Sequence, residues 1–82
     1  MPDVLNVFVR SRKAVVFEGP VYSVTSFNEL GEFDIMSEHA NMITLLKDKL
    51  IIDKDRSTEK EITFENALMS VARNEVAVYL DI

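Results

Sequence analysis

Hydrophobic and polar residues alternate with a period of two along most of this chain. Between Val4 and Arg10, Leu5, Val7 and Val9 fall on one face, and polar or aromatic residues fall on the other. This spacing predicts a β-strand, because successive side chains of a strand point to opposite faces. Similar patterns predict further strands, about nine in all, at residues 14–18, 21–27, 33–35, 42–47, 49–53, 62–64, 67–73 and 76–80.

Turn-forming residues separate these segments. Gly19-Pro20 is predicted to end the second strand, since proline lacks the amide hydrogen that a central strand needs. Residues 28–31 are predicted to form a turn in which Gly31 adopts a positive φ. The polar residues 54–60 indicate the tip of a hairpin, and Asn74-Glu75 a two-residue connection.

Two segments leave alternatives open. Residues 37–41 form either a polar corner or a single helical turn capped by Ser37. Residues 67–72 contain alanine, leucine and methionine, which favour helix, but their strand-like neighbours favour a hairpin arm. Short strands without a sustained helical period predict an all-β sandwich or barrel, and the 82 residues predict one domain, 1–82.

Composition narrows the function. The net charge of −5 argues against nucleic-acid binding, and we interpret residues 10–13 (RSRK) as a solvated turn. The chain has no cysteine, its apolar runs are far shorter than the roughly 20 residues that span a bilayer, and residues 1–3 do not resemble a signal peptide. We therefore expect a soluble domain that meets a membrane only through partners.

No catalytic arrangement is evident. Glu29 with Glu32, or Glu59 with Glu61, would suit glycoside hydrolysis only inside a walled cleft, and these residues are predicted to lie in exposed turns. His39 is the one histidine, and it offers too few ligands for a transition metal, so we interpret it as a hydrogen-bonded corner residue. The serines lie in no Gly-x-Ser-x-Gly context, and the two glycines form no phosphate loop. These features predict a binding module without catalytic residues, metal or cofactor.

A series of segments resembles a known family. They are residues 15–19 (VVFEG), 21–24 (VYSV), 31–35 (GEFDI), 39–40 (HA) and 43–47 (ITLLK). In order and spacing they are similar to the amino-terminal domain of the epsilon subunit of rotary ATP synthases. The resemblance covers nearly the whole chain and depends on the series rather than on any single motif.

The resemblance implies a flattened β-sandwich of two roughly five-stranded sheets. It also implies a non-catalytic rotor subunit that binds the gamma subunit of the central stalk and the polar loops of the membrane rotor ring. Its location would be the cytoplasmic face of the cell membrane, through the complex. By position, the gamma interface would contain Ser11, His39, Met42 and Thr44, and the rotor-ring interface would contain Glu29 and Glu32.

The chain departs from the family pattern at several turns. Asp34 replaces a glycine, Ser37-Glu38 and Asp48-Lys49 each replace Pro-Gly, Asn41 replaces a proline, and Asn66-Ala67 replaces Gly-Gly. The family's carboxy-terminal helical hairpin has no counterpart in these 82 residues. The alternative function is a free-standing β-sandwich adaptor that uses the same surfaces for another protein.

Overall fold

The computed structural model describes residues 4–37 and 41–81, which form seven strands and no helix. The all-β prediction is therefore confirmed, including a strand at residues 67–72. The strands are β1 (Leu5–Arg10), β2 (Val15–Val21), β3 (Ser23–Asn28), β4 (Gly31–Met36), β5 (Met42–Ile52), β6 (Lys60–Ala72) and β7 (Glu75–Leu80).

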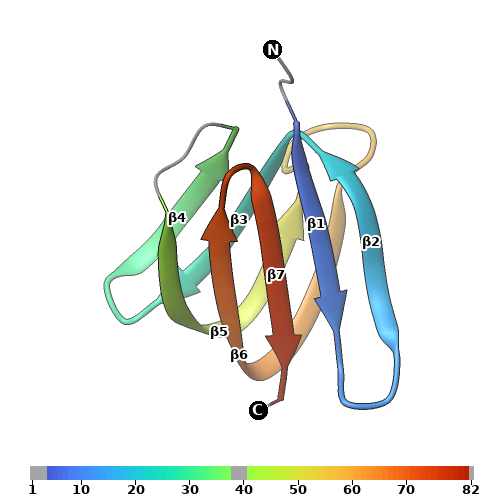
Figure 1. Ribbon diagram of the computed structural model, residues 1–82. Coiled ribbons are helices and arrows are strands. Elements are labelled where there is room, and N and C mark those ends of the chain that lie inside the picture. Colours follow the sequence, from blue (N-terminus) through green and yellow to red (C-terminus); the bar gives the residue numbers. More distant parts are fainter. Residues whose placement is uncertain (1–3, 38–40, 82) are drawn as a thin grey trace.

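The strands form one hydrogen-bonded sheet in the order β2-β1-β7-β6-β5-β3-β4. All neighbours are antiparallel except β1 and β7, which are parallel. Figure 1 shows that the sheet folds over on itself, with β2, β1 and β7 in a front layer and β3 and β4 in a rear layer. Over the described residues the sheet has seven strands, so the division into two roughly five-stranded sheets is not confirmed.

The long strands β5 and β6 join the two layers. The two strands predicted at residues 42–47 and 49–53 form the single strand β5, and Glu65-Asn66 does not interrupt β6. The register between β5 and β6 shifts between Lys47 and Lys49, and Asp48 there adopts a φ of 73°. Such bulges bend a strand, and this one lets both strands pass from the front layer to the rear layer.

Two predicted turns differ in position. Strand β2 continues through Gly19 and Pro20, so the prediction that they end it is wrong. Strand β2 lies at the edge of the sheet and pairs only with β1, and proline is tolerated on an edge because its missing amide hydrogen faces no neighbour. The last hairpin turns at Arg73 and Asn74, with φ of 52° and 63°, as two-residue hairpin loops require.

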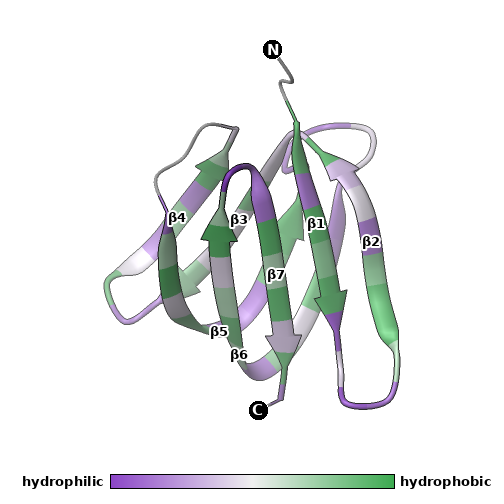
Figure 2. Ribbon diagram, viewed as in Figure 1, coloured by the Kyte–Doolittle hydropathy of each residue, from purple (hydrophilic) through white to green (hydrophobic). Residues whose placement is uncertain are grey.

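The space between the layers is filled by aliphatic side chains from every strand. Figure 2 shows the hydrophobic positions alternating with polar ones along these strands. Burial of this apolar surface is the main stabilising contribution to a fold without disulfides. The buried cluster contains Leu5, Val7, Val9, Val21, Val24, Ile35, Leu46, Leu50, Ile52, Ala67, Met69, Val71, Val76, Val78 and Leu80.

Candidate functional site

The turn between β3 and β4 projects from the sheet and is tied to β5. The Asn28 side chain accepts a hydrogen bond from the Leu30 amide (2.9 Å) and donates one to the Thr44 hydroxyl of β5 (3.2 Å). Gly31 has a φ of 115°, as predicted for this turn. The turn presents Leu30, which is 91% exposed, and the exposed carboxylate of Glu29. Asn28 thus connects this turn to β5.

Glu32 lies nearby on β4 in a different setting. Its Oε2 atom is 2.9 Å from Nζ of Lys54, and this contact raises the pKa of the lysine. Both side chains are largely solvated, so the pair contributes little to stability. The two residues predicted to meet a rotor ring therefore differ, since Lys54 already neutralises Glu32, whereas no ion pair involves Glu29 among the described residues.

The residues predicted to meet gamma do not form one cluster. The Ser11 hydroxyl accepts hydrogen bonds from the amides of Lys13 and Ala14 and closes the β1–β2 hairpin. Met42 packs against the core, and Thr44 is half-buried beside Asn28. Strands β7 and β6 separate β1 from β5, so Ser11 lies well away from Thr44. His39 lies outside the described residues.

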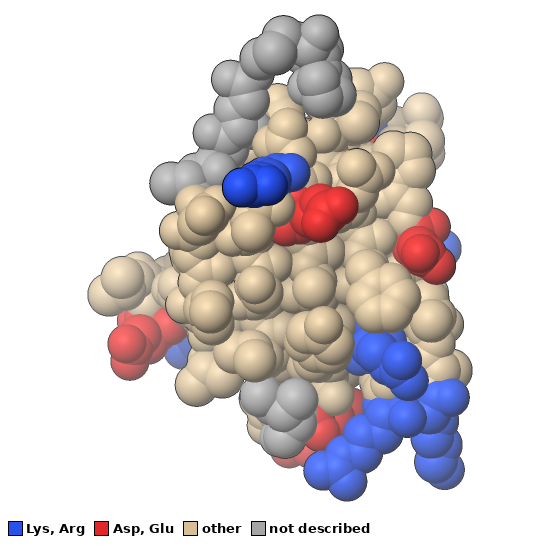
Figure 3. Space-filling view, viewed as in Figure 1, with Lys and Arg blue, Asp and Glu red and all other residues tan. Residues whose placement is uncertain are grey.

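The intervening residues of β5 face outward. Ile43 is 73% exposed and Leu45 is 63% exposed. Across the front layer, Leu45 is in register with Leu68 and then with Tyr79, so their side chains share the outer face. Figure 3 shows this face as a broad central area without charged side chains, which lie around its margin. The sequence contained the signal, since both faces of residues 42–46 are apolar or weakly polar, but sequence alone did not decide which face is buried.

The rear layer carries more polar contacts on its outer face. Besides the Lys54–Glu32 contact, Lys49 pairs with Glu61 at 3.3 Å. The Thr25 hydroxyl donates to Asp34 of β4 at 2.6 Å. These contacts pair polar side chains of the rear layer, where Met36 of β4 is nevertheless 58% exposed. The front layer exposes Ile43, Leu45 and Tyr79. Exposed apolar patches of this kind mark sites of protein contact.

A buried carboxylate holds the loop after β5 against the start of β3. Asp53 accepts hydrogen bonds from the amides of Tyr22 (2.6 Å) and Ser23 (3.2 Å) and from the Thr58 hydroxyl (2.7 Å). Burial acts to raise its pKa, but these hydrogen bonds and the nearby Arg56 charge outweigh burial and lower the pKa from 3.8. Arg56 also lies over the Tyr22 ring at 4.1 Å. Asp53 is thus fully occupied by structural contacts.

The other carboxylate pairs considered for chemistry also make local contacts. Glu59 accepts a hydrogen bond from the Asp55 amide (2.7 Å), and Glu61 pairs with Lys49. Among residues 4–37 and 41–81, no three His, Cys, Asp or Glu side chains gather in a group able to hold a metal ion. Over the same residues, no helix is long and apolar enough to cross a membrane.

Comparison with known proteins decides the family. The family model for the β-sandwich domain of the ATP synthase delta/epsilon chain matches residues 4–82. The chain belongs to this family. The relationship predicted from the sequence is therefore confirmed, and it extends over nearly the entire chain.

Curated relatives agree with this assignment to the delta/epsilon family. The chain is 28% identical over 80 residues to the ATP synthase epsilon chain of a Nitratiruptor species, covering 96% of this chain and 62% of that relative. It is 28% identical over 78 residues to the epsilon chain of Sulfurimonas denitrificans, covering 94% and 60%. The chain thus spans somewhat under two thirds of the length of these relatives.

Solved structures share the delta/epsilon sandwich fold. A chain in the cryo-EM structure of the Euglena gracilis mitochondrial ATP synthase (OSCP, F1 and c-ring) matches with a TM-score of 0.86 and 13% identity, covering 98% of this chain and 52% of that one. A chain in the central stalk and c-ring structure of the Tetrahymena thermophila enzyme matches with a TM-score of 0.75 and 12% identity, covering 95% and 63%.

Proposed function

We propose that this domain is a non-catalytic rotor component of an ATP synthase. It binds the gamma subunit of the central stalk and the membrane rotor ring, and so couples ion flow to ATP synthesis at the cytoplasmic face of the cell membrane. The observation that carries the proposal is that one sheet presents two distinct exposed features. One is the uncovered apolar face of the front layer, and the other is the projecting β3–β4 turn that Asn28 fastens to β5.

The gamma contact is assigned to the front layer. The predicted residues are Ser11 at the β1–β2 hairpin and Met42 and Thr44 on β5. His39 is also predicted, but it lies outside the described residues. Because Met42 packs against the core, we propose that the contact area on β5 is supplied mainly by its outward neighbours Ile43 and Leu45. Large apolar side chains that become buried in an interface carry most of its binding free energy.

Replacement of Ile43 by aspartate is expected to weaken gamma binding by more than about 1 kcal/mol, because it places a charge in the buried contact. Ile43 is 73% exposed, so the fold should tolerate the change. Titration calorimetry with purified gamma subunit measures the affinity. Thr63→Asp, at an exposed position in the first half of β6, is the matched control. Equal affinities of the two variants would overturn the assignment to β5, and no binding by the wild type would favour the free-standing adaptor.

The ring contact is assigned to Glu29 and Glu32. Glu29→Lys is expected to slow association with the rotor ring severalfold at low ionic strength, because rim charges mainly set association rates. Reversing the charge of Glu32 alone also breaks its ion pair with Lys54. The informative variant is therefore the double change Glu32→Lys with Lys54→Glu, which exchanges the two charges and keeps the pair. Association kinetics with rings in nanodiscs provide the measurement, with gamma affinity as the control. A loss of gamma binding with unchanged ring association would contradict the assignment.

A further inference from the structure

The hairpin that connects β1 to β2 concentrates positive charge at one end of an acidic protein. Its basic cluster, Arg10, Arg12 and Lys13, holds three of the nine Lys and Arg residues, whereas the whole chain has a net charge of −5. Figure 3 shows basic side chains projecting at the lower right, where Figure 1 places this hairpin. The ion pairs among the described residues are Lys49–Glu61 and Lys54–Glu32, so the basic cluster takes part in none of them.

Hydrogen bonds within the hairpin hold the backbone that carries the basic cluster. The Ser11 amide donates to the Ala14 carbonyl (2.9 Å), and the Ser11 hydroxyl accepts from the amides of Lys13 and Ala14 (both 3.3 Å). The Arg10 Nε atom donates to the Ser11 carbonyl (3.1 Å). A guanidinium has further N–H donors, so Arg10 can still donate to a ligand. Because the turn is already formed, a partner does not have to order it on binding.

A hollow of about 240 Å³ lies beside the basic cluster. The described residues that line it are Arg10, Ser11, Arg12, Tyr79 and Leu80, and none of them is acidic. Arg10 and Tyr79 are register partners on β1 and β7, and Tyr79 is 40% exposed. Guanidinium groups bind carboxylates through paired hydrogen bonds and suit interfaces because they are weakly hydrated. The hollow therefore offers two such groups beside an aromatic side chain.

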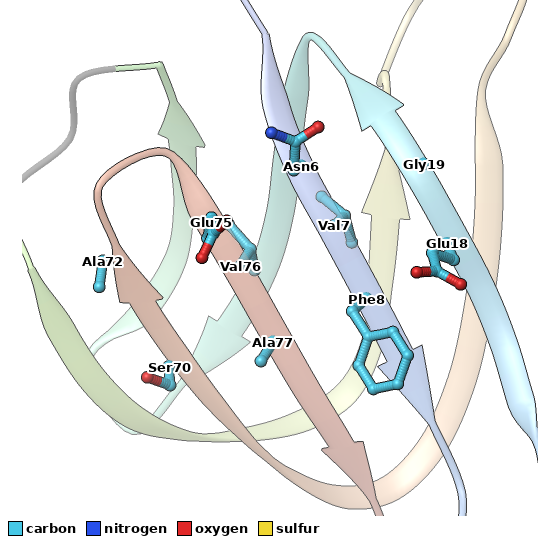
Figure 4. A pocket seen from close by; sticks show the side chains of 10 residues that line it. All are labelled: Asn6, Val7, Phe8, Glu18, Gly19, Ser70, Ala72, Glu75, Val76 and Ala77. Carbon is cyan, nitrogen blue, oxygen red and sulfur yellow. The ribbon is translucent and has the colours of Figure 1, made fainter.

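The charge beside this hollow is opposite to the charge beside a larger cavity on the front layer. That cavity, of about 580 Å³, is bordered by Glu18 and Glu75 (Figure 4). Both side chains are exposed. Like charges placed opposite each other disfavour an interface, whereas opposite charges fix its register. An acidic partner segment is therefore repelled at the larger cavity and attracted to the basic cluster.

We propose that the basic cluster binds an acidic segment of the gamma subunit. One Asp or Glu side chain of gamma lies between Arg10 and Arg12, and a second carboxylate lies beside Lys13. The inference rests on the proposed gamma contact and specifies its chemistry at the β1–β2 hairpin. It also redefines the predicted role of Ser11. The Ser11 hydroxyl is occupied in holding the turn, so the neighbouring cations make the contact instead.

Zero-length cross-linking of the complex with purified gamma subunit tests the proposal directly. A carbodiimide joins a lysine amine to a carboxylate with loss of water, and it does not join a guanidinium. Mass spectrometry is expected to find Lys13 linked to an Asp or Glu of gamma. Lys13→Arg keeps the charge, so it should retain the gamma affinity and lose this cross-link. Cross-links to gamma from other lysines, without any from Lys13, would overturn the proposal.

Matched charge reversals measure how much the basic cluster contributes to affinity. Arg12→Glu is expected to weaken gamma binding roughly tenfold at low ionic strength and less at high salt, because the contact is electrostatic. Lys60→Glu, at the start of β6, changes the net charge equally and should leave the affinity unchanged. Arg12 and Lys60 are both exposed, so the fold should tolerate either change. Equal effects would mean attraction by net charge alone and would refute the inference.

The outcomes separate this inference from the proposed function. If Ile43→Asp weakens gamma binding and Arg12→Glu does not, the inference fails and the gamma assignment stands. If the wild type does not bind gamma, both fail. Vesicles that contain phosphatidylserine test the other anionic surface. Vesicle binding that Arg12→Glu abolishes, with unchanged gamma affinity, would show that the basic cluster meets lipid headgroups, against the proposal.

Discussion

Replacement of Asp53 by alanine is expected to lower the free energy of unfolding by about 2–4 kcal/mol. Asp53 is 4% exposed, and its two carboxylate oxygens accept hydrogen bonds from the Tyr22 and Ser23 amides and the Thr58 hydroxyl. Alanine removes the acceptor of all three donors, which are partly shielded from water. Because small domains are stable by only about 5–15 kcal/mol, a loss of this size is a large fraction of the total.

Asp55→Ala is the matched control for this loss. Asp53 and Asp55 both adopt a positive φ, 53° and 67°, so alanine suffers similar backbone strain at either position. Asp55 is exposed. The difference between the two variants in urea unfolding therefore reports the hydrogen bonds of Asp53. Equal losses would attribute the whole effect to backbone conformation and contradict the role assigned to the carboxylate.

The same carboxylate predicts a pH dependence. The pKa of Asp53 in the folded protein is lower than 3.8, its ordinary value in the unfolded chain. Its ionised form therefore stabilises the fold above the unfolded pKa, and this contribution is lost as the pH falls through the lower folded pKa. We expect the stability gap between wild type and Asp53→Asn to be constant from pH 7 to about pH 5 and to narrow below about pH 4. A gap that stays constant at low pH would refute this.

The role of Asp53 illustrates what sequence reasoning missed. The chain around it was interpreted as a polar hairpin tip, which is correct for its backbone. Its hydrogen-bond donors, however, lie at Tyr22 and Ser23, far earlier in the sequence. No local pattern indicates that pairing, because it arises only when β3 lies beside the end of β5. Its one visible sign was an acidic residue directly after the apolar run that ends β5.

The strands themselves were largely predictable because alternation depends on local sequence. The inward positions of β1 and β7 follow from the period of two. In β6 the side chains that face the core are at even-numbered positions in the first half, Ile62 and Phe64, and at odd-numbered positions in the second half, Ala67 and Met69. The predicted break at Glu65-Asn66 falls at this change, but the strand bends there instead of ending. Backbone pairing across a bulge is not visible in a single strand's pattern.

Predictions about the contact surfaces were less complete for a different reason. Family position predicts contacts at the β3–β4 turn and at the start of β5. It does not distinguish the inward side chains of Met42 and Thr44 from the outward ones of Ile43 and Leu45. The orientation is set by pairing with β6, where Thr44 lies opposite the buried Met69.

Two leucines of β5 provide the sharpest test of this orientation. Leu50→Ala is expected to lower the free energy of unfolding by about 2–5 kcal/mol, because it leaves a cavity in the core. Leu45→Ala should change it by less than about 0.5 kcal/mol. Leu50 is fully buried and Leu45 is 63% exposed, although both lie in the same strand. Urea unfolding of the two variants measures the difference.

The comparison also separates stability from binding. Leu45 belongs to the apolar front face, so Leu45→Ala should weaken gamma binding while leaving the fold intact, whereas Leu50→Ala should affect binding only through the unfolded fraction. Under conditions where both variants remain folded, Leu45→Ala should therefore bind gamma more weakly than Leu50→Ala, although Leu50→Ala is the less stable of the two. Equal stability losses at the two positions would mean that the front face of β5 is covered within the domain itself, and the exposed surface on which the proposed gamma contact depends would not exist.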